Sequence, residues 1–137
     1  LIVGILDLET GKLKLCNAGH NPPILIRPDG QVSFLEFKTQ IFVGVIEEFA
    51  YTEDETTLEK GSKLFLYTDG VTEAENINKE LYGEEKLLEM LSDNASSDVR
   101  TTVNVVVDSI ASHVKEAEAS DDLTILLIQY EPGTANS

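Results

Sequence analysis

Three carboxylates lie next to the two most apolar stretches of the sequence. Asp69 directly follows one apolar run and Glu73 comes four residues later, so one helical turn would bring both side chains to the same place. Asp121 comes just before the second apolar run. A carboxylate at a strand end is held by the sheet with its oxygens free, and Mg²⁺ and Mn²⁺ prefer such hard oxygen ligands. These residues therefore indicate a site for a divalent metal.

Each acidic residue taken alone has a simpler interpretation. The Asp69-Gly70 dipeptide is most often a turn, and the Asp121-Asp122 pair is most often a helix cap or a solvated loop. The two pairs together favour a metal site if their apolar runs are neighbouring antiparallel strands, because the end of one strand then meets the start of the other. We therefore predict that Asp69 and Asp121 face each other across one cleft.

The segment 17–23, with the sequence NAGHNPP, is a third candidate part of this site. The small residue Gly19 allows the backbone to approach another group closely, and His20 comes where the preceding strand is expected to end. A lone histidine is more often a satisfied loop residue than a ligand, and that interpretation stays open. His113 lies among polar residues of a predicted helix and is expected at the surface.

Length and composition limit the classes of protein that the sequence can represent. The 137 residues, 42% of them hydrophobic, suit one soluble domain with its own core. The net charge of -15 argues against a nucleic-acid surface, which needs clustered Lys and Arg. No apolar run approaches the length of a membrane span, no signal-peptide pattern is present, and the single cysteine, Cys16, cannot form an internal disulfide, so we expect a cytoplasmic protein. Because the sequence opens inside a strand-like segment without Met, we expect it to be part of a longer protein.

Hydrophobic periodicity predicts strands followed by two helices and a closing strand. The alternation of apolar and polar residues, the turns between them and the apolar runs predict strands at 1–8, 13–17, 24–26, 31–37, 63–68 and 123–130, with a weaker acidic edge strand at 50–58. The amphipathic patterns predict helices at 83–91 and after an N-cap at Asp98, whereas 41–46 is ambiguous. This order indicates an α+β fold with two helices covering one face of an antiparallel sheet, and 131–137 as a flexible tail. The other face is also apolar, so something absent from this chain, or only partly present, should cover it.

Five segments together resemble the SpoIIE/RsbU-like branch of the PPM metal-dependent protein serine/threonine phosphatases. They are GILDLETGKL, NAGHNPP, LFLYTDGVTEAEN, LYGEEKLLEML and SDDLTILLI, and the resemblance extends over residues 1–130. It implies the C-terminal part of a PPM-type αββα sandwich that is incomplete at its N-terminus. It also implies a centre with two Mn²⁺ or Mg²⁺ ions between the two sheets.

The resemblance assigns roles to individual residues. It implies that Asp69 and Asp121 are metal ligands, that Asp122 occupies an adjacent, usually non-ligating place, and that Glu73 matches a position that helps to hold a weaker third metal in some relatives. His20 stands where many members carry Asp, so it is expected to line the site. The implied reaction is hydrolysis of phosphoserine or phosphothreonine by a metal-activated water, without a protein nucleophile.

One feature of the family pattern is missing from the sequence. The first metal motif, an Asp followed by a Ser-Gly stretch of the DxSGxG type, does not occur in these residues. We therefore expect this chain to be weakly active or inactive as a phosphatase, even if the parent protein is competent.

The resemblance further implies a phosphorylated protein partner, of the anti-anti-sigma type, and an upstream sensor domain in the parent protein. The alternative is a non-catalytic protein-interaction module of the same fold. A calcium-binding β-structure is a weaker alternative, because the dense alternating acids of an EF-hand loop are absent from the sequence. Incomplete cover of the sheet also predicts self-association through exposed apolar surface.

Overall fold

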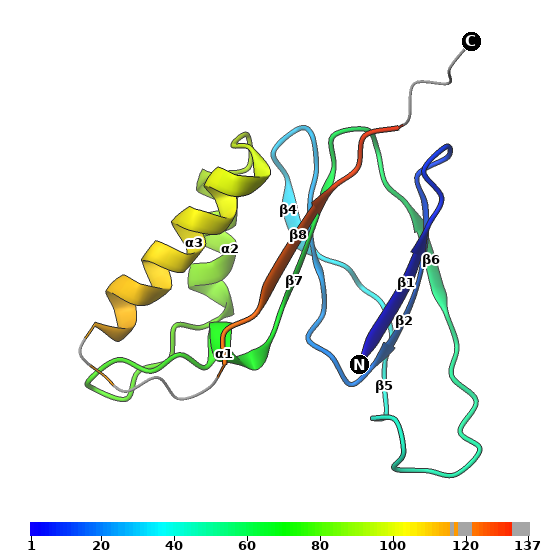
Figure 1. Ribbon diagram of the computed structural model, residues 1–137, viewed down its shortest axis with the longest axis horizontal. Coiled ribbons are helices and arrows are strands. Elements are labelled where there is room, and N and C mark those ends of the chain that lie inside the picture. The colour runs from blue at the N-terminus through cyan, green and yellow to red at the C-terminus, as the bar shows by residue number, and fades with distance from the viewer. Residues whose placement is uncertain (116, 118–121, 133–137) are drawn as a thin grey trace.

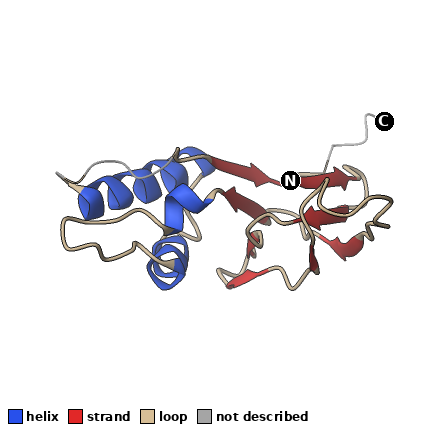
Figure 2. Ribbon diagram, turned by 90° about the horizontal axis from the view of Figure 1, so that it is seen from below, coloured by secondary structure: helices blue, strands red, loops and turns tan. Residues whose placement is uncertain are grey.

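The computed structural model describes residues 1–115, 117 and 122–132, which form three layers (Figure 1). Helices α2 and α3 form the first layer, and two β-sheets stacked on each other form the second and third. Figure 2 shows the helices gathered on one side of the strands. The strands are β1 Ile2–Leu6, β2 Lys12–Ala18, β3 Ile24–Ile26, β4 Val32–Phe34, β5 Thr39–Gln40, β6 Asp54–Thr57, β7 Lys63–Tyr67 and β8 Ile125–Gln129. The helices are α1 Asp69–Thr72, α2 Glu84–Asp93 and α3 Val99–Val114.

The outer sheet is built around β2. This strand pairs antiparallel with β1 and β6 and parallel with the short β5. A tight turn joins β1 to β2, in which Asp7 Oδ1 accepts hydrogen bonds from the amides of Glu9 and Thr10 at 2.9 and 3.0 Å. The predicted acidic edge strand is confirmed as β6, whereas the parallel pairing of β5 was not predicted.

The inner sheet has the order β4-β3-β7-β8, and all its strands are antiparallel to their neighbours. The two most apolar runs of the sequence are therefore neighbouring antiparallel strands, as expected. Tyr67 pairs with Ile125 at one end of β7 and Lys63 pairs with Gln129 at the other. The end of β7 thus meets the start of β8.

Side chains from both sheets form the core between them. The alternation of β2 points Leu13, Leu15 and Asn17 inward, where they are 3%, 3% and 1% exposed. Residues Leu25 and Leu64 meet them from the inner sheet. The first strands of this chain therefore cover the face of the inner sheet opposite the helices, except along one edge. The expected lack of cover applies also to the outer sheet, where Val3 and Ile5 of β1 are 55% and 68% exposed.

The second core lies between the inner sheet and the helices. Phe65 and Tyr67 point from β7 to this side, and α2 and α3 contribute buried leucine, valine and isoleucine side chains. Asp98 caps α3 as predicted, since its side chain accepts a hydrogen bond from the Thr101 amide at 3.0 Å. Both predicted helices are confirmed. None of the helices in the described ranges has the length and apolar character that crossing a membrane requires.

The two sheets separate along the edge formed by β1 and β8. A hollow of about 250 Å³ opens there between them. Its walls are Ile2, Gly4, Leu6, Leu13, Leu15, Leu58, Leu64, Leu66, Leu126 and Ile128. Leu126 is 53% exposed and Ile128 41% exposed, so apolar surface faces solvent at this edge.

Lys63, at the start of β7, is a buried cation that fastens the helices to the inner sheet. The residue is 5% exposed, and its Nζ donates to the carbonyl oxygens of Ala95, at 2.8 Å, and Ser97 in the connection between α2 and α3. Burial lowers the pKa of the ammonium, while the nearby Asp98 carboxylate acts in the opposite direction. Lys63 thus supplies hydrogen bonds to two backbone carbonyls that lie outside the helices and strands.

Replacing Lys63 with Met should lower the free energy of unfolding by roughly 2 kcal/mol, because the carbonyls of Ala95 and Ser97 lose a charged donor. Urea denaturation followed by circular dichroism measures this change. The matched control is Lys60→Met in the turn before β7, where the side chain is exposed. Equal stability of the two variants would contradict this role for Lys63.

Candidate functional site

The candidate site lies where β7 ends and β8 begins. Thr68 joins the two segments: its amide donates to the Thr124 carbonyl at 3.1 Å and its hydroxyl donates to the Asp122 carbonyl at 3.1 Å. The Thr124 amide in turn donates to Thr68 Oγ1 at 3.1 Å. The segments 68–70 and 122–124 are therefore held against each other by backbone and hydroxyl groups.

Gly70 is required by the closeness of these two segments. A Cβ atom at this position would lie 2.5 Å from the carbonyl oxygen of Asp122, which is too close for any side chain. From the sequence, Gly70 was expected to allow a sharp turn of the backbone. In the structure Gly70 is the second residue of the helical turn α1. Its small size thus serves the packing of 122–124 on α1.

The turn α1 presents Asp69 and Glu73 at this junction. Asp69 is its first residue, and the Glu73 amide donates to the Asp69 carbonyl at 2.8 Å. The helical turn that was the condition for bringing Glu73 near Asp69 is present, and it places the two residues one turn apart. Both are exposed at the surface. Thr68 is at the N-cap position, but its hydroxyl bonds to Asp122 rather than to the helix.

The position of Asp121, the other predicted ligand, lies outside the described residues. Its neighbour Asp122 is described and exposed, and its carbonyl oxygen touches the start of α1. No group of three or more His, Cys, Asp or Glu side chains able to hold a metal occurs within the described ranges. The exposed carboxylate of Asp69 fits a hard cation that keeps most of its waters. Facing carboxylates of Asp69 and Asp121 stay a prediction.

The loop after β2 carries His20 to the same end of the sandwich. The buried amide of Asn17 holds this loop from both sides: its Nδ2 donates to the His20 carbonyl at 2.8 Å, and its Oδ1 accepts from the His20 amide at 2.7 Å. The His20 ring Nδ1 lies 2.9 Å from the Asn21 carbonyl, a bond that the ring makes when Nδ1 carries the proton. The structure thus shows how Asn17 shapes the loop.

His20 and the β7–β8 junction line one hollow of about 180 Å³. The residues around it are Ile2, His20, Leu66, Tyr67, Thr68, Thr124 and Leu126. The structure therefore brings His20 beside the threonines that hold the junction. Thr68 and Thr124 were not predicted as residues that line this site, although a threonine near the acids in both segments was the available signal.

Tyr67 is a buried polar residue at the end of β7. It is 2% exposed, and among the described residues its hydroxyl has no hydrogen-bond partner. Burial raises the pKa of this hydroxyl, and the charges of Glu84 and Asp69 raise it further. Tyr67 is therefore neutral and lies in the field of the acidic residues at the site, at an energetic cost that its packing must offset.

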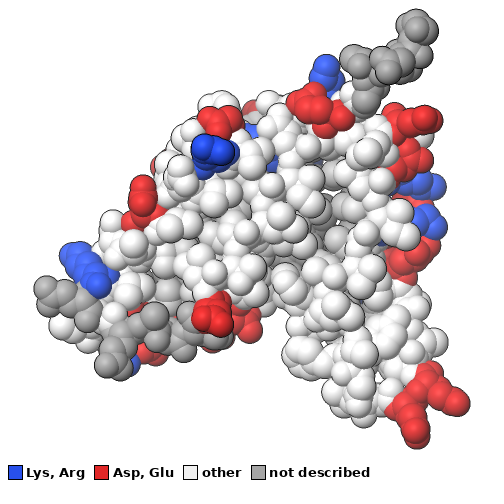
Figure 3. All heavy atoms as spheres, viewed as in Figure 1, with Lys and Arg blue, Asp and Glu red and all other residues white. Residues whose placement is uncertain are grey.

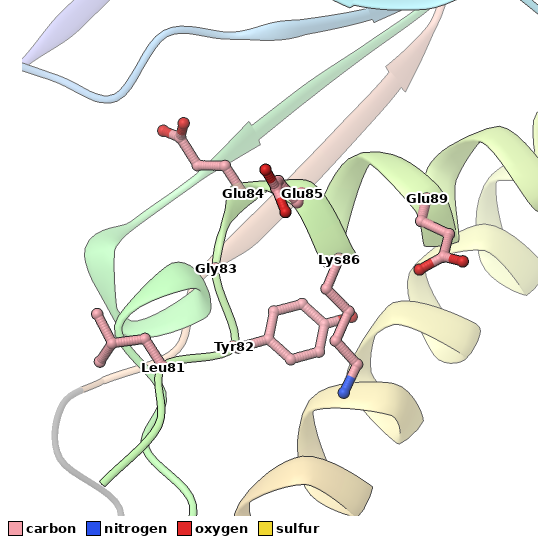
Figure 4. Close-up of a pocket in the computed structure, with 7 residues that line it drawn as sticks. All are labelled: Leu81, Tyr82, Gly83, Glu84, Glu85, Lys86 and Glu89. Atoms are coloured by element: carbon pink, nitrogen blue, oxygen red, sulfur yellow. The ribbon is translucent and has the colours of Figure 1, made fainter.

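A second, open hollow lies beside the start of α2 and is lined by Leu81, Tyr82, Gly83, Glu84, Glu85, Lys86 and Glu89 (Figure 4). Lys86 Nζ lies 5.0 Å from the centre of the Tyr82 ring, whereas Glu84 and Glu85 point away from that ring. Tyr82 also contacts His113 edge-on at 5.6 Å between ring centres. His113 was expected at the surface from the sequence, but the structure shows it partly buried against Tyr82. These contacts hold α2 to α3.

A family model matches nearly the whole chain. The model of Stage II sporulation protein E (SpoIIE) covers residues 1–131. Among curated proteins, Protein IcfG of Synechocystis sp. is 30% identical over 128 residues, which are 93% of this chain and 20% of that protein. Phosphoserine phosphatase RsbU of Bacillus subtilis is 24% identical over 124 residues, which are 90% of this chain and 36% of that protein.

The fold agrees with a solved phosphatase domain. The phosphatase domain of the cell fate determinant SpoIIE from Bacillus subtilis, presoaked with Mn, superimposes with a TM-score of 0.74 at 18% identity. The match covers 98% of this chain and 57% of that chain. At this identity the likeness shows the fold, and the α+β sandwich expected from the sequence is confirmed.

Replacing Asn17 with Ala should destabilise the protein by roughly 2 kcal/mol, because the buried amide makes both hydrogen bonds that hold His20. In ¹H–¹⁵N NMR spectra, the amide of His20 should move much further than that of a residue outside the loop. Asn104→Ala on the exposed side of α3 is the matched control for urea denaturation. Unchanged stability in Asn17→Ala would show that the loop does not depend on this side chain.

Proposed function

The chain belongs to the SpoIIE family, in the RsbU-like branch of the PPM phosphatases, and from this premise we propose that it forms the C-terminal part of a metal-dependent protein serine/threonine phosphatase domain. The observation that carries the proposal is the β7–β8 junction, where Thr68 and Gly70 hold the Asp69 turn against the segment that follows Asp121. A family resemblance alone would leave open whether the two acidic segments meet. The backbones of residues 68–70 and 122–124 lie against each other, which supports the proposal.

The proposed ligands are Asp69 and Asp121, with Glu73 contributing to a further, weaker position. A Mn²⁺ or Mg²⁺ ion, two of them in an intact site, would supply the positive charge that activates water and stabilises charge on the phosphoryl group. Asp69 would be fixed by its place at the start of α1, and Thr68 would hold that start in place through Asp122. His20 would line the approach to the phosphate, in the hollow that it shares with Thr68 and Thr124.

The activity of the whole protein, its substrate and its partners are proposals as well. The chain spans 20% of IcfG and 36% of RsbU, so most of each relative has no counterpart in this sequence. We infer a phosphorylated protein of the anti-anti-sigma type as substrate, in a parent protein that also carries a sensor domain. The net charge of -15 makes a nucleic-acid substrate unfavourable.

The alternative is a protein-interaction module that has lost catalysis. The presence of Asp69, Glu73 and Asp121 in the sequence supports the enzyme. Mn²⁺ binding separates the two proposals, because an interaction module needs none.

Mn²⁺ titration by calorimetry should detect weak binding to this chain. Asp69→Asn should weaken that binding by more than about tenfold, because the loss of a direct ligand costs more than the loss of a residue that only supports a ligand. The reason is that Asn keeps the shape of Asp but removes the negative charge that a hard cation needs. Asp93→Asn, at the exposed end of α2, is the matched control and should bind Mn²⁺ like the wild type. Equal binding by all three proteins would refute Asp69 as a ligand.

Hydrolysis of a phosphoserine peptide with Mn²⁺ should be slow in this chain and absent in Asp69→Asn. Rapid turnover by the chain alone would contradict the expectation that it lacks an essential part of the metal centre.

We also expect self-association through the β1–β8 edge, where Leu126 and Ile128 are exposed. Sedimentation equilibrium should show an average mass that rises with protein concentration. The double variant Leu126→Lys with Ile128→Lys should stay monomeric, because charged residues on an edge strand oppose pairing. Leu8→Lys in the exposed β1–β2 turn is the control and should associate like the wild type. A wild type that is monomeric at every concentration would exclude this contact.

A further inference from the structure

The loop between β5 and β6 exposes an apolar surface that neither core uses. Phe42, Val43, Val45 and Ile46 are 62%, 58%, 62% and 51% exposed. Scattered apolar residues at a surface are ordinary, but here four of five consecutive residues are both apolar and exposed. We call the segment Ile41–Ile46 the apolar loop. Sequence periodicity left its structure ambiguous, and the structure shows it as a projecting loop without strand pairing.

The apolar loop is held at its base by specific hydrogen bonds. Gln40 Nε2 donates to the Thr52 carbonyl at 2.7 Å, and Gln40 Oε1 accepts from the Thr52 amide at 2.8 Å. Tyr51 Oη donates to the Phe42 carbonyl at 3.2 Å, and its ring contacts Phe49 edge-on at 4.8 Å between centres. The exposed side chains are therefore presented by an anchored segment, so less conformational entropy is lost when they bind a partner.

The apolar loop touches the loop that carries His20. Gly19 has a φ of +76°, and a Cβ atom there would overlap the Phe42 ring. One side of Phe42 thus packs on the residue next to His20, while most of its surface is exposed. In Figure 1 the apolar loop and the α1 end of β7 lie at the same, lower end of the molecule. Through Phe42, the apolar loop therefore contacts the loop that carries His20 to the proposed phosphatase site.

The charges around the apolar loop restrict the class of its partner. Glu47 and Glu48 follow it directly, and the sequence contains no Lys or Arg from 39 to 59. Figure 3 shows this lower lobe without blue atoms and with acidic atoms at its tip. Anionic lipid surfaces and nucleic acids attract basic segments, so both are unfavourable partners for an acidic rim. A protein surface with apolar side chains fits the apolar loop.

We propose that the apolar loop is the docking surface for the protein substrate and binds apolar side chains that flank the phosphorylated residue. The inference rests on the proposed phosphatase function, because the contact of the apolar loop with the His20 loop is what selects a substrate over another protein. Val43, Val45 and Ile46 make the contact. Phe42 positions the loop against Gly19. The apolar loop would thus select which phosphoproteins reach the site, whereas the metal site itself would accept any phosphoserine.

The test compares two fluorescent phosphoserine peptides of equal length and charge by fluorescence anisotropy with Mn²⁺ present. One carries Leu, Ile and Phe around the phosphoserine, and the other carries Ser and Gln at those positions. Wild-type chain should bind the apolar peptide about tenfold more tightly, a difference of about 1.4 kcal/mol. The triple variant Val43→Ser, Val45→Ser and Ile46→Ser should bind both peptides equally.

The control for the triple variant is Leu8→Ser with Ile77→Ser, two residues that are 63% and 74% exposed elsewhere on the surface. It should keep the tenfold preference, and circular dichroism should show all variants folded, since only exposed side chains change. Equal binding of the two peptides by wild type, or a preference that survives in the triple variant, would overturn the docking proposal.

Unphosphorylated versions of both peptides separate this proposal from the phosphatase function. If docking and phosphate recognition are both correct, the apolar peptide without phosphate should bind more weakly than its phosphorylated form, and still more tightly than the polar one. If phosphate adds nothing to the affinity while the apolar preference persists, the docking surface stands and the proposed phosphatase site does not.

Discussion

The antiparallel pairing of β7 with β8 is the constraint on which the proposed site depends. Tyr67 and Ile125 are 58 positions apart in the sequence, yet they pair directly, and Thr68 continues the contact with Asp122 and Thr124 beyond the ends of the strands. The apolar side chains of β7 are packed on one face against the helices and on the other against the outer sheet, and Leu127 of β8 is buried on the helix side. Two buried faces fix the register, because a slip of one residue would exchange the two sets of side chains.

Other parts of the molecule contribute to the same end of the sandwich. The outer sheet brings the His20 loop, whose shape depends on the buried amide of Asn17. The β5–β6 connection adds exposed apolar side chains next to Gly19. Tyr67 leaves a buried hydroxyl without a partner among the described residues, close to Glu84 and Asp69. Three separate connections thus contribute to this end of the sandwich, which also contains the close backbone contact at Gly70 and the buried hydroxyl of Tyr67.

Much of this arrangement follows from local pattern in the sequence. The inward alternation of Leu13, Leu15 and Asn17, the N-cap at Asp98 and the one-turn helix after Asp69 are local features, and all are confirmed. Contacts between distant segments were not predictable in the same way. Gly70 is small because Asp122 touches it, and Phe42 is placed by Gly19 rather than by its own neighbours. The parallel pairing of β5 involves two residues, too few to give a periodic pattern.

The central claim is that the acidic ends of β7 and β8 and the His20 loop form one site for a divalent cation. Paramagnetic broadening of ¹H–¹⁵N resonances by substoichiometric Mn²⁺ tests it most directly, since broadening reports every amide near the ion. If these segments bind one ion, the amides of 68–73, of 122–124 and of His20 should broaden together and before the rest. Broadening confined to other acidic surfaces, such as 53–55 or 84–89, with these amides unaffected, would contradict it.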